Sequence, residues 1–154
     1  MTTLNRSAHR LAAIAVLAFA TPAFADSTSP AGRWRTIDDA TGKPRSVVEI
    51  TESNGELQGR VLRVIDPPGG NPNPLCAKCE GERKDQPVVG MTFLWGLKLD
   101  GEQWSGGSIL DPNNGKVYRA KATLVDGGGK LEVRGFIGIS LLGRTQVWLR
   151  EEGE

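Results

Sequence analysis

From Gly32 onward the chain alternates apolar and polar residues almost without interruption, and this two-residue period limits its fold more than any other feature. Segments with apolar residues at helical spacing are scarce. Successive side chains of a strand point to opposite faces, so an alternating chain builds sheets with one apolar and one polar face. We therefore predict an all-β protein.

Eight short strands are expected, most of them joined by tight turns. Asn54-Gly55 and Asp100-Gly101 are typical of hairpin turns, because two-residue turns need positive φ angles that Asn, Asp and Gly tolerate. One connection, residues 66–89, is long and lies between the third and fourth strands. The expected strands cover residues 32–37, 46–51, 57–65, 90–99, 102–110, 116–125, 130–136 and 143–149.

Strands that follow one another through hairpins form an up-and-down antiparallel meander. Eight of them with one apolar face close most economically into a small barrel, which also removes the sheet edges that promote aggregation. A two-sheet sandwich is the alternative, but it usually needs several long crossovers, and only one connection here is long. The prediction is an eight-stranded up-and-down barrel.

The interior of this barrel is expected to hold five large rings, from Trp34, Phe93, Trp95, Trp104 and Tyr118. In the fourth strand we place Met91, Phe93, Trp95, Leu97 and Leu99 on one face, and in the last strand Thr145, Val147 and Leu149 point inward. A solid core and a small pocket are both compatible with this set. If a pocket exists, Phe93, Trp95, Trp104 and Tyr118 are its expected walls.

The first 25 residues have the pattern of a secretory signal peptide. Arg6 and Arg10 precede an apolar run, residues 11–20, and Ala23-Phe24-Ala25 is an A-x-A cleavage signal. The run is shorter than the roughly 20 residues of a membrane span. We expect cleavage after Ala25, a single domain over residues 26–154, and a periplasmic or secreted protein.

Cleavage also removes His9, the only histidine of the chain. A histidine-dependent triad or proton shuttle is then excluded, and the commonest transition-metal ligand is lost. Loss of Arg6 and Arg10 leaves 17 of the 19 basic residues against 18 acidic ones, a balance that predicts neither a nucleic-acid partner nor an anionic membrane surface as partner. The expectation is a protein without catalytic residues, cofactor or resident metal.

The two cysteines, Cys76 and Cys79, lie three positions apart in the long connection. In an oxidising compartment such a pair most simply forms a disulfide that ties one turn of the loop. A redox dithiol would need a thiolate stabilised at a helix N-terminus, which this loop does not predict. A zinc site would need two further ligands. The disulfide is favoured, and the redox and metal readings stay open.

Residues 136–143, "FIGISLLG", are the most apolar stretch after the leader and do not alternate strictly. One interpretation is a short helix that plugs the end of the barrel. The other is an exposed patch for an envelope partner, formed by Ile137, Ile139, Leu141 and Leu142. Arg134, Arg144 and Trp148, expected on outward faces, would then form the rim of the patch.

Four segments of the chain resemble a bacterial family of exported proteins, the domain of unknown function 2147 family: "GRWRTIDDATGKPRSVVEI", "LCAKCEGERKDQPVVG", "WSGGSILDPNNGKVY" and "VRGFIGISLLGRTQVW". The resemblance implies a lipocalin-like, or calycin, barrel and brings no established activity. In such barrels a Gly-x-Trp on the first strand meets an arginine of the last strand. Here Trp34 would meet Arg144 or Arg150 in a cation–π contact of ~0.5–2 kcal/mol.

These observations favour non-catalytic binding of a small apolar ligand inside the barrel. The alternative is an envelope protein-interaction module with a filled core, which would bind its partner through residues 136–143. A redox or metal-binding Cys-x-x-Cys protein is the third interpretation. Neither nucleic-acid binding nor membrane insertion after removal of the leader is expected.

Overall fold

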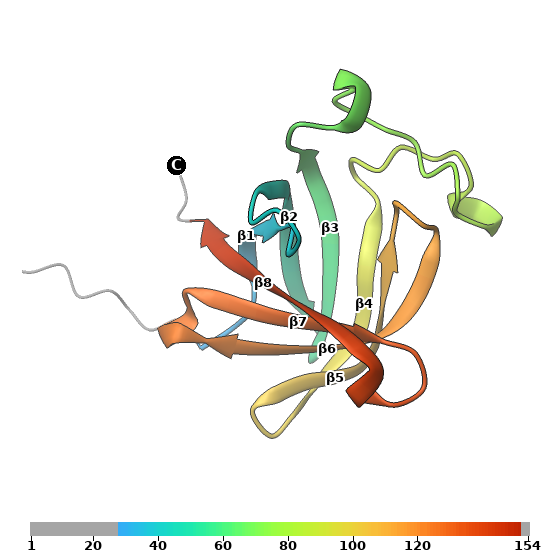
Figure 1. Cartoon of the computed structure of the whole chain (residues 1–154). Helices are drawn as coiled ribbons and strands as arrows, with labels where there is room; N and C mark the ends of the chain where they lie inside the picture. Colours follow the sequence, from blue (N-terminus) through green and yellow to red (C-terminus); the bar gives the residue numbers. More distant parts are fainter. Residues whose placement is uncertain (1–27, 152–154) are drawn as a thin grey trace, which may run out of the picture.

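The computed structural model describes residues 28–151, which form a closed antiparallel barrel of eight strands in sequence order (Figure 1). The predicted all-β, up-and-down architecture is therefore confirmed, and the signal peptide expected over residues 1–25 lies outside the described range. The strands are β1 (Gly32–Ile37), β2 (Pro44–Ser53), β3 (Glu56–Val64), β4 (Thr92–Asp100), β5 (Gln103–Asp111), β6 (Lys116–Val125), β7 (Lys130–Phe136) and β8 (Gly143–Glu151). β8 pairs with β1, with Arg150 opposite Trp34, and this closes the barrel.

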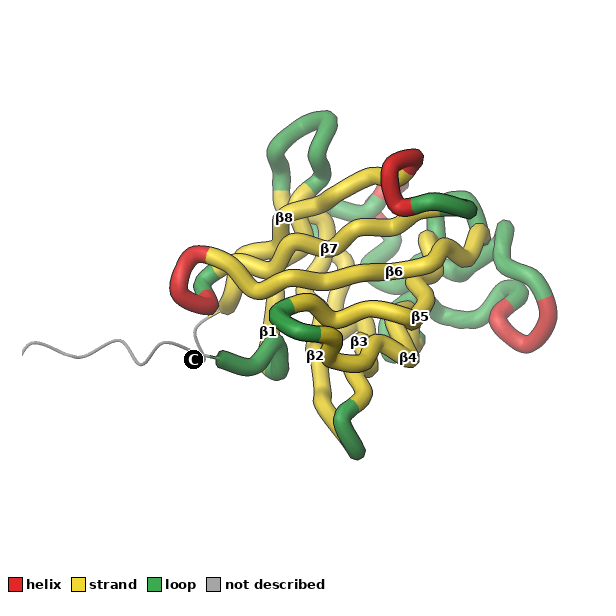
Figure 2. The backbone as a smooth tube through the Cα atoms, turned by 90° about the horizontal axis from the view of Figure 1, so that it is seen from below, coloured by secondary structure: helices red, strands yellow, loops and turns green. Residues whose placement is uncertain are grey.

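The connections fall into two groups at opposite ends of the barrel (Figure 2). The β2–β3, β4–β5 and β6–β7 hairpins lie at the end that also carries residues 28–31 and Glu151, which we call the closed end. The β1–β2, β3–β4, β5–β6 and β7–β8 connections lie at the other end, which we call the open end. Three of the four short 3-10 helices are at the open end: η1 (Pro68–Gly70), η2 (Gly81–Arg83) and η4 (Ser140–Leu142), whereas η3 (Asp126–Gly128) is at the closed end.

The turn residues act as the sequence predicts. Asn54 and Gly55 join β2 to β3 with φ angles of 53° and 73°. Two successive positive φ angles give the turn the twist that matches paired strands, and Asn and Gly adopt them at low cost. Within residues 28–151 no helix is long and apolar enough to cross a membrane.

In β4 the expected inward face is right for Met91, Phe93 and Leu97, which are buried, and wrong for Trp95 and Leu99, because the strand contains two irregularities. Its partners on β3 step from Leu57–Leu97 to Gln58–Trp95, and from Gly59–Leu94 to Arg60–Thr92. Each step adds one residue to β4 and shifts the alternation. As a result Phe93 and Leu94 are both buried, Trp95 is only half-buried, and Leu99 is 58% exposed at the β4–β5 hairpin.

The expected inward face of β8 is also wrong. Trp148 is buried at 1% exposure, whereas Val147 and Leu149 are each 38% exposed. A one-residue shift of the alternation exchanges the two faces of a strand. The inward set Gln146, Trp148 and Arg150 is favoured because it buries the large indole and brings Arg150 against Trp34.

Candidate functional site: a cavity at the open end of the barrel

A cavity of about 870 Å³ opens at the open end of the barrel. Small-molecule sites usually have volumes of about 300–1,000 Å³, so this one is large enough for a ligand. Its deeper walls are apolar and come from six strands. They include Val48 and Val61 of β2 and β3, Phe93 of β4, Ile109 and Leu110 of β5, Val133 of β7 and Trp148 of β8.

The cavity exists because the wall residues in this half of the barrel are small. Val48, Val61 and Val133 face it, where longer side chains would meet across the barrel. Gly135 faces it too, and a Cβ at this position would lie 3.4 Å from Cγ2 of Ile109 and 3.6 Å from Cβ of Tyr118. A barrel of eight strands is just wide enough for side chains to fill, so valine and glycine leave room.

The closed half of the barrel is filled. Leu57, Leu97, Leu131 and Trp104 are buried there, and Trp34 is completely buried. The rings of Phe93 and Trp148, with centroids 5.8 Å apart and planes at 45°, lie where the filled half meets the cavity. Tilted ring pairs at this distance are attractive. This pair therefore forms the floor of the cavity.

Arg150 seals the closed end over Trp34. Its guanidinium lies 4.2 Å from the centroid of the indole, and the Trp34 Nε1–H donates to the carbonyl of Pro30 at 2.8 Å. Burial lowers the pKa of Arg150. Its three guanidinium nitrogens each donate a hydrogen bond of 2.6–2.9 Å to a backbone carbonyl, of Ser29, Ala31 or Gly128. Of the two arginines expected over Trp34, Arg150 makes the contact and Arg144 does not.

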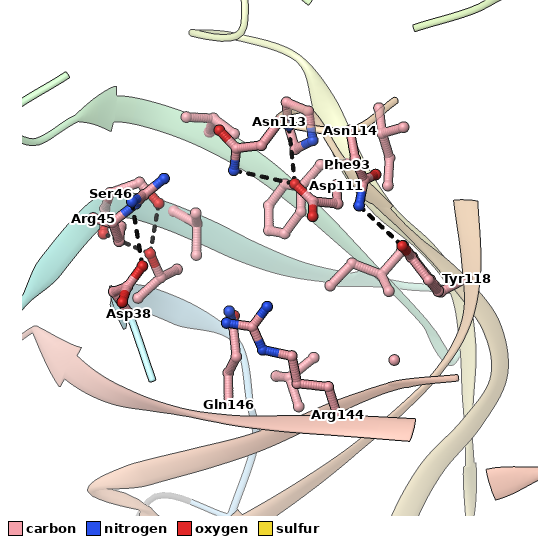
Figure 3. A pocket seen from close by; sticks show the side chains of 18 of the residues that line it. Asp38, Arg45, Ser46, Phe93, Asp111, Asn113, Asn114, Tyr118, Arg144 and Gln146 are labelled. Carbon is pink, nitrogen blue, oxygen red and sulfur yellow. Dashed lines mark hydrogen bonds and ion pairs between the residues drawn. The ribbon is translucent and has the colours of Figure 1, made fainter. Parts of the chain in front are cut away.

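The mouth of the cavity is polar, and most of its groups have partners within the chain (Figure 3). Arg45 Nη1 pairs with Asp38 Oδ2 at 3.2 Å, and Asn114 Nδ2 donates to the Tyr118 hydroxyl at 2.9 Å. Asp38 has a lowered pKa, chiefly because its carboxylate accepts the backbone N–H of Thr41. These groups surround an entrance to an apolar interior.

Arg144 projects from β8 into this mouth and forms an ion pair with Asp39 of the β1–β2 connection. Two of its guanidinium nitrogens, Nε and Nη2, donate to the carboxylate. The hydrogen bond lowers the pKa of Asp39 and raises that of Arg144, and the charges of Asp38 and Asp111 raise the Arg144 pKa further. The pair joins two neighbouring segments of the entrance, the start of β8 and the β1–β2 connection, since β8 and β1 are adjacent in the barrel. Both partners are solvent-accessible, with 61% of the Arg144 side chain and 37% of the Asp39 side chain exposed.

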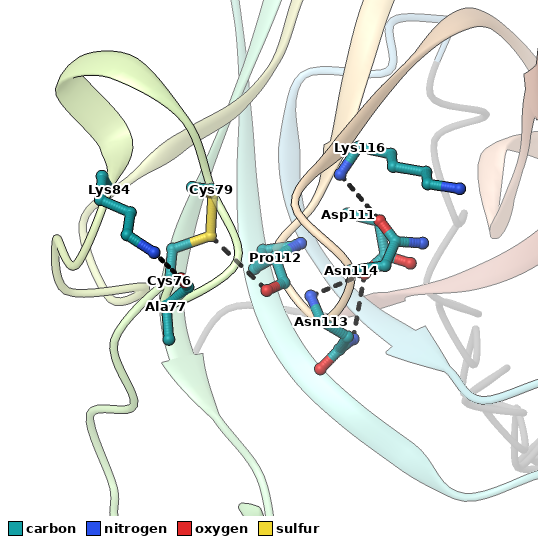
Figure 4. The surroundings of a disulfide bond; sticks show 9 residues. All are labelled: Cys76, Ala77, Cys79, Lys84, Asp111, Pro112, Asn113, Asn114 and Lys116. Carbon is teal, nitrogen blue, oxygen red and sulfur yellow. Dashed lines mark hydrogen bonds between the residues drawn. A yellow bond between two sulfur atoms is a disulfide. The ribbon is translucent and has the colours of Figure 1, made fainter.

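The two cysteines are joined in a disulfide, Cys76–Cys79, with the Cα atoms 5.3 Å apart (Figure 4). Both are buried, and the Cys76 N–H donates to the carbonyl of Gln86 at 2.8 Å. The loop packs against the β5–β6 turn so closely that a Cβ on Gly115 would lie 1.8 Å from the Lys78 carbonyl oxygen. The disulfide segment is thus one wall of the open end.

That loop also contributes to the cavity itself, through Pro74, Leu75 and Val88. Its second half approaches β4, where the guanidinium of Arg83 lies 4.6 Å from the ring centroid of Trp95. Across residues 28–151, no group of three or more His, Cys, Asp or Glu side chains is arranged to hold a metal ion.

The structure separates the four residues expected to line a pocket. Phe93 and Tyr118 line the cavity, and Trp104 is buried in the closed half. Trp95 is not part of the cavity lining; it is half-buried against the core, beneath Arg83. Sequence reasoning missed Trp148 in the floor. A signal was present: if Arg150 must point inward to reach Trp34, then Trp148, two positions earlier, must also point inward.

The segment 136–143 does not plug the barrel. Its helix η4 has no buried residue, and Ile137, Ile139, Leu141 and Leu142 are 62%, 63%, 86% and 77% exposed. They lie beside the cavity, since Ile137 and Leu142 also contribute to its lining. Of the expected rim residues, Arg134 lies beside this segment, Arg144 points into the mouth and Trp148 is in the core.

An eight-stranded barrel that is sealed by a tryptophan–arginine contact at one end and open at the other is a lipocalin-like, or calycin, barrel. The chain belongs to the bacterial family DUF2147, described as an uncharacterized protein conserved in bacteria, whose match covers residues 32–150. A similar solved structure is that of protein HP1028 from Helicobacter pylori, described as belonging to the lipocalin family. It is 22% identical, with a TM-score of 0.69 over 82% of this chain and 85% of that one. No curated protein matches the chain.

Proposed function

We propose that the protein binds a small apolar ligand, without catalysis, in the cavity at the open end of the barrel. The observation that carries this proposal is the contrast inside one barrel: a packed half under Trp34, and an unfilled apolar half above Phe93 and Trp148. Lipocalin-like barrels can hold one small molecule in this position, which supports the proposal.

The chemistry of the walls favours an apolar ligand. Burial of apolar surface contributes about 25 cal/mol per Å², and the deep walls are aliphatic and aromatic. At the mouth Asp38, Tyr118 and Arg144 already have partners within the chain. The other polar groups of the lining are also paired, Thr36 with Ser46 and Gln146 with the indole N–H of Trp148. A polar end of the ligand would therefore lie at the mouth, within reach of water.

The absence of catalysis is part of the proposal. A general base near neutral pH is usually a histidine or a carboxylate whose pKa has been raised. His9 is the only histidine of the chain, and Asp38 and Asp39 at the mouth have lowered pKa values. In Asp38 and Asp39 hydrogen bonds thus favour the ionised carboxylate, the opposite of the shift that a general base at neutral pH needs.

A titration with N-phenyl-1-naphthylamine, a neutral apolar dye, tests the cavity. We expect saturable binding to the wild type and binding weaker by about tenfold or more in V61F/V133F, which puts two rings into the walls. The matched control V117F/V147F makes the same change at valines that are 48% and 38% exposed, and should bind like the wild type. Failure of the wild type to bind this dye, or an equal loss in both variants, would contradict the proposal.

We also propose that the protein is exported to the periplasm or beyond. The pattern of residues 1–25 supports this. Fractionation of the producing bacterium, with N-terminal sequencing of the purified protein, should find the chain outside the cytoplasm with Asp26 as its first residue. A cytoplasmic protein that keeps Leu11–Ala20 would contradict it.

A further inference from the structure

The β7–β8 connection presents four apolar side chains to solvent, Ile137, Ile139, Leu141 and Leu142, which we call the apolar tip. Leu141 is the most exposed, at 86%. The backbone here is held in place: Arg134 donates from Nε to the Ser140 carbonyl at 2.7 Å and from Nη2 to the Leu141 carbonyl at 3.1 Å. The exposed arrangement of the tip is therefore fixed by hydrogen bonds from β7.

Beside the tip lie two cations on the outer face of β6, Arg119 and Lys121, which we call the basic stripe. Arg119 and Lys121 lie 5.6 and 5.9 Å from the ring centroid of Phe136, the residue that leads into the tip. Lys121 is paired in register with Arg134, which anchors the tip. In the described part of the chain neither of the two forms an ion pair, and β6 and β7 together contain one carboxylate, Glu132.

The β7–β8 connection that carries the tip lies at the open end of the barrel (Figures 1 and 2), and the cavity opens at the same end. Ile137 and Leu142 are exposed outside and also line the cavity. Exposed large apolar side chains gather at this end, because six of the nine among residues 28–151 belong to open-end connections or to the adjacent start of β6. These six are Leu75, Val117, Ile137, Ile139, Leu141 and Leu142.

We propose that the open end docks on the surface of an anionic lipid bilayer, with the apolar tip at the boundary between head groups and acyl chains and the basic stripe on the lipid phosphates. Protein surfaces with apolar side chains beside Lys and Arg bind such interfaces in two ways. The apolar side chains are buried among the acyl chains, and the cations are attracted to the anionic lipids. The lipid phosphates can pair with the unpaired cations of the basic stripe, and the hydrocarbon of the acyl chains can cover the exposed leucines of the apolar tip.

A lipid surface fits this feature better than a protein partner does. Stable protein interfaces use about 20–30 residues from each side, whereas the tip is four side chains on one short connection. Docking would also point the cavity mouth at the membrane, so that an apolar ligand could pass between bilayer and barrel. That last step rests on the proposed ligand binding, but docking itself does not.

Flotation with vesicles tests the docking. Wild-type protein is mixed with vesicles of phosphatidylglycerol and phosphatidylethanolamine, or of phosphatidylcholine alone. We expect binding to the anionic vesicles that weakens as salt is raised, and little binding to phosphatidylcholine. The variants L141E/L142E and R119E/K121E should each bind the anionic vesicles about tenfold or more weakly.

Two matched controls change the same residue types at the closed end. L99E alters a leucine that is 58% exposed, and K98E reverses an exposed lysine of β4; both should bind like the wild type. No flotation of the wild type, or an equal loss in the controls, would overturn the proposal. The proposal would also be overturned if the wild type did not bind vesicles and instead formed a dimer in sedimentation, or co-purified with another protein, through a contact that depends on Leu141.

The cavity variant V61F/V133F separates this proposal from ligand binding. It should lose the naphthylamine dye and keep vesicle binding, because its changes lie inside the barrel. Vesicle binding without any dye binding would remove the ligand-binding function and leave docking in place. Loss of vesicle binding by this variant, while it remains folded by circular dichroism, would overturn docking through the tip.

Discussion

The two ends of this barrel are built from the same eight strands and yet differ in how their interiors are packed. At the closed end Trp34, Trp104 and several leucines occupy the interior completely. At the open end valines and Gly135 face one another across a cavity of about 870 Å³. The difference shows that the placement of large rings along the barrel axis, more than their number, decides whether such a barrel can hold a ligand.

Each end also has one inward-pointing arginine, and the two are used differently. Arg150 donates to three carbonyls and covers Trp34, and these acceptors are fixed backbone groups. Arg144 is paired with a carboxylate on a surface connection, and 61% of its side chain is exposed. The first arrangement is structural, whereas ion pairs like the second contribute about 0–1 kcal/mol and are easily replaced.

The largest expected effect comes from truncation of the closed end. Trp34→Ala should lower the free energy of unfolding by about 3–5 kcal/mol, because it removes a fully buried ring and leaves Arg150 without its contact. Val133→Ala, at the wall of the existing cavity, should cost only about 1–2 kcal/mol. Urea denaturation followed by circular dichroism measures both. Equal losses would mean that the two halves are packed alike.

A smaller effect is expected from removal of the disulfide. The bond closes a very short loop, so C76S/C79S should lower the free energy of unfolding by no more than about 2 kcal/mol. Hydrogen exchange should then increase in residues 66–90, while amides of β1 and β8 stay protected. A comparable increase at Trp34 would show that the loop supports the whole barrel.

The comparison of wild type with C76S/C79S requires that Cys76 and Cys79 are oxidised in the wild-type protein. Thiol titration of the exported protein, denatured without reductant, should find no free thiol, since Cys76 and Cys79 are bonded to each other. Two free thiols would favour the redox interpretation of the Cys-x-x-Cys pair, and zinc retained through dialysis would favour the metal interpretation.

The smallest expected effect is the pH dependence of the Arg144–Asp39 pair. The pKa of Asp39 is lowered below its ordinary value of 3.8, so the pair stabilises the fold above this pH, and the contribution is lost as pH falls further. Thermal melts of wild type and D39N should differ at pH 7 and pH 5, and the difference should shrink only as the pH falls below 3.8. Asp38 also has a lowered pKa, but it is present in both proteins, so its contribution to the pH dependence cancels in the difference between them. A difference that is independent of pH would contradict this account.

Much of the fold could be predicted from local pattern. Alternation and turn residues such as Asn54-Gly55 specify strands and hairpins, and eight of them with one apolar face close into a barrel. The two wrong faces have physical causes that a local pattern does not carry. In β4 the extra residues are set by pairing with β3, and in β8 the contact between Arg150 and Trp34, more than 100 residues away, selects the inward face.

The site was less predictable than the fold. The sequence gathers Phe93, Trp95, Trp104 and Tyr118 on inward faces, but their heights along the barrel depend on register. Phe93 and Tyr118 reach the cavity, whereas Trp104 fills the closed half and Trp95 lies under Arg83. The cavity itself is defined by small residues, such as Val133 and Gly135, whose importance appears only once the opposite wall is known.

The four tryptophans provide the most direct test that the open half binds a ligand and the closed half does not. Their indole N–H signals can be followed in an NMR titration of ¹⁵N-labelled protein with N-phenyl-1-naphthylamine. Trp148 in the cavity floor should shift. Trp34 and Trp104 in the closed half, and Trp95 beneath Arg83, should not. An unchanged Trp148 signal at saturating dye, or shifts confined to Trp95, would contradict the account.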